Sequence, residues 1–279
     1  MNNSLAKILV TGANGMLGKD LCPMLEDCGY EVIETDIENL DITDELQTMK
    51  TISEINPDYL IHCAAYTNVD KAEEDKNTAY LINVTGTENI AKACAANDVT
   101  MIYISTDYVF DGTNNKPYNT NDKTSPINIY GQTKYEGENA VQKYCQKYYI
   151  ARTSWLYGHH GKNFVETMIS LAQKDELKVV DDQIGCPTWT IDLSEAIITL
   201  IDDNADYGVY HLCGGGMTSW YGFANEIFKI TGLKTNLKPC SSDEFLRPAK
   251  RPAYSVMNNE KLLRDWKLAL QEYIELRVD

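Results

Sequence analysis

Tyr130 and Lys134 are four residues apart in a stretch with helical periodicity, so a helix would place a phenol and an ammonium on one face. Free tyrosine has a pKa near ~10 and free lysine near ~10.4. A lysine held beside the phenol favours the phenolate, which would make Tyr130 a usable acid or base at neutral pH. The spacing therefore predicts proton transfer, and neighbouring motifs must distinguish this function from a chance pairing of two common residues.

A hydroxyl group that could act together with Tyr130 lies at the end of an apolar run, residues 101–105. Ser105-Thr106-Asp107-Tyr108 begins there, and doubly wound sheets place ligand-contacting residues after the carboxyl ends of their strands. Thr106 could hydrogen-bond a substrate carbonyl oxygen and stabilise the charge that develops on it during hydride transfer. A simple strand-end turn of Ser, Thr and Asp is the structural alternative.

A glycine-rich turn near the start of the chain predicts a dinucleotide site. The apolar run 7–11 leads directly into Gly12-Ala13-Asn14-Gly15-Met16-Leu17-Gly18, which opens a helix-like segment. Glycines allow a tight turn and a close approach of backbone N–H groups to a pyrophosphate at the helix N-terminus. A structural turn would also explain the glycines, but the flanking strand and helix favour cofactor binding. The predicted contacts are Gly12, Asn14, Gly15, Met16 and Gly18.

Asp36 ends the next strand-like run, where a dinucleotide fold places a carboxylate against the adenosine ribose. This charge would repel the 2′-phosphate of NADPH, and no Lys or Arg between Asp36 and Gln47 would neutralise it. The sequence therefore favours NADH, with NADPH possible, and a solvated acidic loop is the alternative. The remaining predicted cofactor contacts are Asp41 and Ile42 at the adenine, and Ala64, Ala65 and Thr67 at the middle of the cofactor, although small residues at the end of this strand could also simply pack.

Short apolar runs alternate with longer amphipathic segments through the first half of the chain. The strand-like runs are residues 7–11, 31–36, 59–63, 101–105 and 149–153. The helix-like segments are residues 17–27, 43–55, 70–97 and 129–144. This alternation predicts an α/β fold with a doubly wound parallel sheet and right-handed crossovers.

The alternation loosens in the second half, which has helix-like segments at 163–173 and 191–201 and short apolar runs at 177–180 and 209–213. We expect residues 1–155 to form a Rossmann-like NAD(P)-binding domain, to which the strand near 207–213 returns. Residues 156–279 should form mainly a smaller, mixed α/β substrate-binding region. No Pro-, Gly- or Ser-rich linker separates them, so they should pack closely.

Composition excludes several classes of partner. The formal net charge of −16 opposes binding to nucleic acid or to an anionic membrane, because both favour positive surfaces. No apolar run approaches the ~20 residues of a membrane span, and the first seven residues lack the apolar stretch of a secretory signal. We therefore expect a soluble, cytoplasmic protein. Eight dispersed cysteines without a Cys-x-x-Cys pair indicate reduced thiols, and the four histidines predict no transition-metal site.

Four strings resemble the dTDP-4-dehydrorhamnose reductases, a family of extended short-chain dehydrogenases/reductases. They are STDYVFDG at residues 105–112, NIYG at 128–131, RTSWLYG at 152–158 and DQIGCPT at 182–188. The resemblance covers essentially the whole chain. It implies reduction of the 4-keto group of dTDP-4-dehydro-L-rhamnose by NADH or NADPH, the last step in making dTDP-L-rhamnose for surface polysaccharides.

The resemblance also implies roles for individual residues. Tyr130 would protonate the carbonyl oxygen while hydride arrives at C4, Lys134 would tune Tyr130 and hold the nicotinamide ribose, and Thr106 would orient the carbonyl. Asp107 and Trp155 fall on substrate-contacting positions, although Trp155 could also be a core aromatic residue.

Arg251 falls in a tail motif near the nucleotide diphosphate, which arginine can bind through two hydrogen bonds. Arg247 and Lys250 extend this basic cluster, and a solvated surface cluster is the alternative for these two. Some members of the family are magnesium-dependent dimers, but we can assign no carboxylate cluster in this sequence to a bridging ion. Magnesium, and the choice between monomer and homodimer, are therefore left open.

Three other functions fit parts of the sequence. Dehydratases of this fold usually carry a glutamate after the strand-end Thr-Asp, where this chain has Tyr108. Epimerases keep the Tyr and Lys, so only the longer strings argue against them. A non-catalytic subunit resembling the regulatory subunit of methionine adenosyltransferase is the main alternative, and the intact Thr106, Tyr130 and Lys134 favour catalysis over it.

Overall fold

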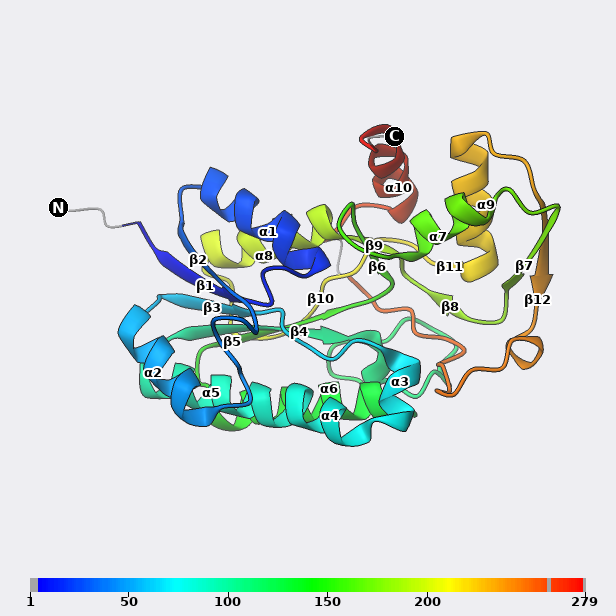
Figure 1. The fold of residues 1–279 in the computed structure, drawn as a ribbon. Helices are drawn as coiled ribbons and strands as arrows, with labels where there is room; N and C mark the ends of the chain where they lie inside the picture. The colour runs from blue at the N-terminus through cyan, green and yellow to red at the C-terminus, as the bar shows by residue number, and fades with distance from the viewer. Residues whose placement is uncertain (1–4, 260–261, 278–279) are drawn as a thin grey trace.

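The computed structural model describes residues 5–259 and 262–277, so the first four residues of the N-terminal segment lie outside it. A six-stranded sheet runs through its centre in the order β10-β5-β4-β3-β1-β2 (Figure 1). All neighbouring strands pair in parallel. The predicted doubly wound parallel sheet is confirmed. The strands are β1 (Lys7–Thr11), β2 (Glu31–Thr35), β3 (Tyr59–His62), β4 (Thr100–Thr106), β5 (Tyr148–Thr153) and β10 (Gly208–His211).

Helices cover both faces of this sheet, because successive side chains of a buried strand point to opposite sides. Ile8 and Val10 of β1 face the layer of α1 (Met16–Asp27) and α8 (Thr190–Asp202). Leu9 faces the layer that contains α2 (Glu45–Ile55), α5 (Thr87–Ala96) and α6 (Ile129–Tyr144) (Figure 1). β1 lies between β2 and β3 in the sheet, so the chain builds the sheet outward from β1 first on one side and then on the other. At such a reversal of strand order, a crevice opens at the carboxyl ends of the strands.

The segment predicted as one helix over 70–97 is broken into shorter pieces. These are α3 (Val69–Glu74), α4 (Lys76–Tyr80), the π-helix η1 (Leu81–Gly86) and α5. Asp75 lies outside helical geometry at φ −114° and ψ 60°, and its side chain accepts a hydrogen bond from Thr78 N as an N-cap. The prediction of a single helix was wrong, because the spacing of apolar residues does not reveal that Asp75 caps a new helix inside this segment.

The second half contains a smaller helical and mixed-strand region around an aromatic core, in which Tyr157, Trp189, Phe223, Trp266 and Tyr273 are buried. Its strands pair as β12 with β7, β6 with β9, and β11 with β8. The chain returns to the central sheet through α8, which packs on α1, and through β10. The elements of this region are β6 (Leu156–Tyr157), α7 (Phe164–Leu171), β7 (Glu176–Val180), β8 (Ile184–Gly185), β9 (Thr188–Trp189), β11 (Thr218–Ser219), α9 (Trp220–Thr231), β12 (Asn236–Cys240), the 3-10 turn η3 (Ser242–Glu244) and α10 (Trp266–Glu275).

All eight cysteines are free thiols; Cys28 is exposed, Cys63 is half-buried and the others are buried. Within the described ranges, no helix has both the length and the apolar character needed to cross a membrane.

Candidate functional site

A cavity of about 680 Å³ opens at the carboxyl edge of the sheet, along the crevice between the turns that follow β1 and β3. Its wall continues past the ends of β4 and β5 to the aromatic region of the second half. It is lined by Thr11, Gly12, Gly15, Met16, Leu17, Gly18, Asp36, Ile37, Leu40, Asp41, Ile42, Thr43, Cys63, Ala64, Ala65, Thr67, Val69, Ile82, Ile104, Ser105, Thr106, Asp107, Tyr108, Tyr130, Lys134, Thr153, Ser154, Trp155, Leu156 and Trp220.

The cavity contains fifteen of the seventeen residues predicted to contact cofactor or substrate. Asn14 and Arg251 are the two exceptions. Asn14 is exposed, and its backbone N–H donates to Asp36 Oδ2 at 3.0 Å, so it contributes to the turn through its backbone.

The backbone of the glycine turn lies so close to neighbouring backbone atoms that a Cβ atom would not fit at Gly12 or Gly18. Gly12 has φ +68°, and a Cβ there would lie 2.6 Å from Ala64 N. A Cβ at Gly18 would lie 2.5 Å from Ala13 O, so this glycine brings α1 against the turn. Gly15 is the N-cap of α1 and supplies no capping side chain, which leaves the first N–H groups of the helix available to an anion.

The end of β2 and the loop after it line the cavity where the sequence predicts the adenine to bind. Asp36 is held by N–H groups of Asn14 and Ile37, at 3.0 Å and 2.8 Å from its two oxygens. The buried Asn89 donates to Ile42 O at 3.0 Å and thereby fixes the loop beside Asp41. Sequence reasoning missed Asn89, which lies within the segment that was predicted as a long helix.

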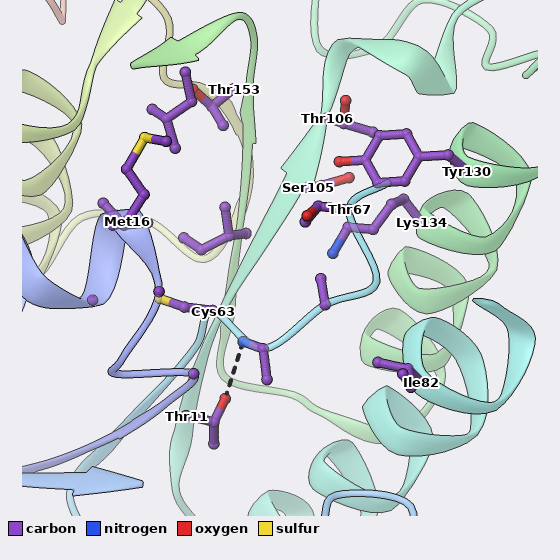
Figure 2. A pocket seen from close by; sticks show the side chains of 18 of the residues that line it. Thr11, Met16, Cys63, Thr67, Ile82, Ser105, Thr106, Tyr130, Lys134 and Thr153 are labelled. Atoms are coloured by element: carbon purple, nitrogen blue, oxygen red, sulfur yellow. Dashed lines mark hydrogen bonds between the residues drawn. The ribbon is translucent and has the colours of Figure 1, made fainter. Parts of the chain in front are cut away.

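Tyr130 and Lys134 reach into the cavity from neighbouring turns of α6, beside Thr106 at the end of β4 (Figure 2). The N-terminus of α6 is fixed by Asn128 Oδ1, which accepts from Gly131 N at 2.7 Å. Glu73 of α3 accepts from Ile129 N at 2.8 Å, which anchors the same turn. The predicted one-face arrangement of the phenol and the amine is therefore present.

Burial is the main influence on the pKa values of Tyr130 and Lys134. Desolvation raises the pKa of Tyr130 to about 12, against the lowering effect of a hydrogen bond with Thr106. Desolvation lowers the pKa of Lys134 to about 7, and the nearby Glu138 opposes this shift. The expectation that Lys134 would favour a tyrosinate is not met here, because desolvation and the charge of Asp107 raise the pKa of Tyr130 and Lys134 is not among the groups that shift it. At neutral pH, Tyr130 is a protonated donor.

Asp107 brings a buried carboxyl group to the cavity wall. Its Oδ1 accepts from Thr106 Oγ1 at 3.1 Å, while Oδ2 is buried without a hydrogen-bond partner among the described residues. Burial raises the pKa of Asp107 to about 7, against hydrogen bonds from Ser255 and Thr106 that lower it. Since a buried polar atom without a partner is costly, Oδ2 is suited to a ligand hydroxyl.

Two stacked indoles close the far end of the cavity. The rings of Trp155 and Trp220 lie 3.5 Å apart between centroids at an interplanar angle of 4°. Trp155 adopts the unusual φ of 48°, and Trp220 Nε1 donates to Gln183 Oε1 at 3.2 Å. Sequence reasoning named Trp155 but missed Trp220, because no local pattern connects a residue at the start of α9 with one after β5.

Arg251 does not line the cavity. It binds Asp70 at the start of α3, whose neighbour Val69 does line it. The cavity residue Tyr108 experiences both charges, since Arg251 lowers and Asp70 raises its pKa. Arg251 therefore lies near the cavity but is not part of its lining.

A buried asparagine in the π-helix was also missed. Asn83 accepts from Tyr66 N at 2.7 Å and donates to Tyr66 O at 3.1 Å and to Thr133 Oγ1 at 3.0 Å. It thus links the loop after β3 to the residue that precedes Lys134. A π-helix is uncommon and often marks a functional site. The partners of Asn83 are far away in the sequence, so no local pattern predicts this arrangement. No three His, Cys, Asp or Glu side chains in residues 5–259 and 262–277 gather in a way that could hold a metal ion.

This chain is similar to known proteins of one family. The family model described as the RmlD substrate binding domain matches residues 6–277. The chain is 41% identical to the spore coat polysaccharide biosynthesis protein SpsK of Bacillus subtilis, over 98% of both proteins.

Two solved structures are similar over nearly their full length. A dTDP-4-dehydrorhamnose reductase of Clostridium acetobutylicum is 48% identical, with a TM-score of 0.94 over 97% of this chain and 99% of the other. A dTDP-4-dehydrorhamnose reductase of Bacillus anthracis in complex with NADP is 41% identical, with a TM-score of 0.95 over 98% and 100%. The family resemblance seen in the four sequence strings is confirmed, and the chain belongs to the RmlD substrate binding domain family.

Proposed function

We propose that this protein reduces the 4-keto group of dTDP-4-dehydro-L-rhamnose with NADH or NADPH and forms dTDP-L-rhamnose. The names of the two similar solved enzymes, at 48% and 41% identity, support this substrate. The observation that carries the proposal is the meeting of Thr106, Tyr130 and Lys134 in one cavity with the turn at Gly12.

The residues present fit a nicotinamide dinucleotide. Gly12 leaves room that a Cβ would fill, and α1 begins with N–H groups that no side chain caps. Ile37 lines the cavity although 68% of it is exposed, so it offers an apolar surface to a flat base. We assign cofactor contacts to Gly12, Asn14, Gly15, Met16, Gly18, Asp36, Asp41, Ile42, Ala64, Ala65, Thr67, Tyr130 and Lys134, with Asn14 acting through its backbone.

The proposed mechanism uses the three polar groups as a proton-transfer site. The reduced nicotinamide, when bound, supplies the hydride. Tyr130 gives its proton to the substrate oxygen, and its raised pKa keeps it protonated until negative charge develops on that oxygen. Thr106 hydrogen-bonds the same oxygen, and Lys134 places positive charge where the tyrosinate forms.

We assign substrate contacts to Asp107, Trp155 and Arg251. The unpartnered Oδ2 of Asp107 supports a hydrogen bond to a sugar hydroxyl. The indole of Trp155, backed by Trp220, offers an apolar face to the CH groups of a deoxy sugar. Arg251 is suited to the diphosphate because a guanidinium can donate two parallel hydrogen bonds. In this structure its NH1 and NH2 groups donate to Asp70.

The alternatives are less well supported by the site. At the position of the dehydratase glutamate, Tyr108 packs edge-on against Tyr130 with ring centroids 5.8 Å apart, and it offers no carboxylate for removing water. A non-catalytic subunit would not require the proton donor, the amine and the hydroxyl to converge in one cavity.

A coupled assay tests the proposal. The dTDP-4-keto sugar is generated by the preceding dehydratase and epimerase, and oxidation of NADH and of NADPH by the pure protein is followed separately. We expect turnover above the enzyme-free blank with dTDP-L-rhamnose as the product by mass spectrometry. Binding of cofactor and sugar nucleotide without turnover would contradict the reductase function and favour a binding subunit.

The proposal includes the division into a cofactor-binding part, residues 1–155, and a mainly substrate-binding part, residues 156–279. We also propose that the protein is cytoplasmic and that it is a monomer or a homodimer. The position of Trp220 at the far end of the cavity supports the division, since it extends the aromatic core of the second half. Light scattering of the purified protein measures the oligomeric state.

A further inference from the structure

A completely buried ion pair lies behind the proposed catalytic residues. Glu138 and Arg152 have side chains that are 1% and 5% exposed. Arg152 donates from Nε to Glu138 Oε1 at 2.9 Å and from NH2 to Oε2 at 2.7 Å. A third donor, Arg152 NH1, reaches Thr120 O at 3.2 Å. The carboxylate and the guanidinium are therefore held in one fixed geometry.

Stability alone does not account for this pair. Removing two charges from water costs several kcal/mol per ion, so a buried pair is often no better than well-packed apolar residues of the same volume. The location of the pair suggests another role. Glu138 is one helical turn after Lys134 and two turns after Tyr130, so the three side chains follow one stripe of α6.

The carboxylate also touches the cavity wall. Ser105, which lines the cavity beside Thr106, donates from Oγ to Glu138 Oε1 at 2.5 Å. Glu138 therefore accepts hydrogen bonds from β4 and β5, and it lies one helical turn from Lys134 on α6. The carboxylate pairs directly with Arg152, and its charge also raises the pKa of Lys134.

The other groups around Lys134 carry no negative charge at neutral pH. The ring of Tyr103 on β4 lies 4.1 Å from Nζ of Lys134. At the end of β3, burial lowers the pKa of His62 to about 3 and raises that of the Cys63 thiol, so both are neutral. Tyr130 on α6 is protonated. Among these neighbours, Glu138 has the largest effect in favour of the ammonium form of Lys134, ahead of Cys63.

We propose that Glu138 is a positioning residue of the reduction, which keeps Lys134 charged beside Tyr130 while Arg152 and Ser105 fix the carboxylate. The inference rests on the proposed function, in which Lys134 acts beside Tyr130. It has a direct physical consequence. A guanidinium stays protonated in proteins, so if the charge of Glu138 is lost, Lys134 must release its proton instead of Arg152.

The main test is the variant Glu138→Gln, which keeps the size of the side chain and an oxygen acceptor but removes the charge. We expect the alkaline limb of the kcat profile to move to lower pH by at least about one unit, with turnover at pH 8 falling about tenfold and recovering toward pH 6. The matched control is Glu136→Gln on the same helix. Glu136 accepts from Gln132 and Tyr80 and does not line the cavity, so its profile should match the wild type.

The variant Arg152→Met gives the opposite prediction. Without the second cation, the carboxylate acts on Lys134 alone, and the alkaline limb should move to higher pH. A pair that serves only stability would lower activity in both variants without shifts of opposite sign. That result, or failure of both variants to fold, would overturn the inference.

A direct titration separates this inference from the proposed function. The Nζ signal of Lys134 in the full-length, ¹⁵N-lysine-labelled protein, assigned with Lys134→Arg, is followed against pH without substrate. We expect Lys134 to lose its proton at lower pH in Glu138→Gln than in the wild type. An unshifted titration would refute the role of Glu138 even if the enzyme is active. A shifted titration in a protein without turnover would refute the proposed function and leave the control of the lysine charge intact.

Discussion

Asp70 binds Arg251 through both carboxylate oxygens: Oδ1 accepts from NH1 at 2.8 Å and Oδ2 accepts from NH2 at 2.9 Å. Arg247 donates to the same Oδ2 at 3.3 Å. The pair joins the start of α3 to the segment that follows η3, near the cavity but not in its lining. A substrate diphosphate would therefore meet a guanidinium that a carboxylate already orients.

Replacing Arg251 by Ala should raise the KM for the sugar nucleotide by at least about tenfold and lower kcat less, because the diphosphate contact is equal in the ground state and the transition state. Steady-state kinetics at saturating cofactor measures both constants. The control Lys250→Ala removes one positive charge from the neighbouring exposed side chain and should change KM about twofold or less, since exposed charges are screened. An unchanged KM in Arg251→Ala would exclude the diphosphate role.

Replacing Tyr130 by Phe should lower kcat by at least about a hundredfold, because it removes the proton donor and keeps the ring. Cofactor binding, measured by quenching of tryptophan fluorescence, should be nearly unchanged. Tyr135→Phe is the matched control on the same helix, since Tyr135 packs against another apolar cluster and does not line the cavity. Near-normal turnover of Tyr130→Phe would remove Tyr130 from the mechanism.

The central sheet and most of the cavity could be predicted because their signals are local. β1 and α6 have the predicted bounds at both ends, and the glycine turn lies between the predicted strand and helix. Buried strands of a parallel sheet are continuous apolar runs, and a helix shows the 3.6-residue period, so each is visible in a short window of sequence. Residues at the ends of such elements follow from the topology.

The remaining features depend on partners far away in the sequence. Arg251 meets Asp70 across 181 residues, and the π-helix holds Asn83 against Thr133 across 50 residues. The strand β12 contains Pro239 and pairs with β7, so its residues lack the usual pattern of a strand. Lys134 was expected to lower the pKa of Tyr130, but desolvation raises it, and desolvation depends on packing that the spacing of the two residues does not reveal.

Asp36 should decide the preference between the two nicotinamide cofactors. Asp36 lines the end of the cavity to which we assign the adenosine, and its carboxylate would repel the 2′-phosphate of NADPH. Asp36→Ala should shift the ratio of kcat/KM values toward NADPH by about tenfold. Asp36→Asn is the variant that removes the charge but keeps the size of the side chain and an acceptor for one of the two N–H groups, those of Asn14 and Ile37. Glu38→Ala, which removes an exposed charge outside the cavity, is the control. Equal ratios in wild type and Asp36→Ala would refute the repulsion argument.

Asp107 should make the cofactor-free protein less stable as the pH rises. Burial raises the pKa of its carboxyl to about 7, whereas the unfolded chain has a value near ~3.9. Between these two values the folded state binds the extra proton, so stability falls with rising pH across this window, and the loss is complete above pH 7. Each unit of raised pKa corresponds to about 1.4 kcal/mol.

Asp107→Asn should therefore be more stable than the wild type at pH 8, with a Tm higher by at least ~3 °C, and the difference should vanish near pH 4. Calorimetry across this pH range measures it. Asp111→Asn is the opposite control, because a hydrogen bond from Thr113 N lowers the pKa of Asp111 and its charge stabilises the folded state above pH 4. A Tm of Asp107→Asn below that of the wild type at pH 8 would show that the charged carboxylate is stabilised in the folded protein. The same variant should bind the sugar nucleotide more weakly, because the carboxyl exchanged for stability is the one proposed to hold the substrate.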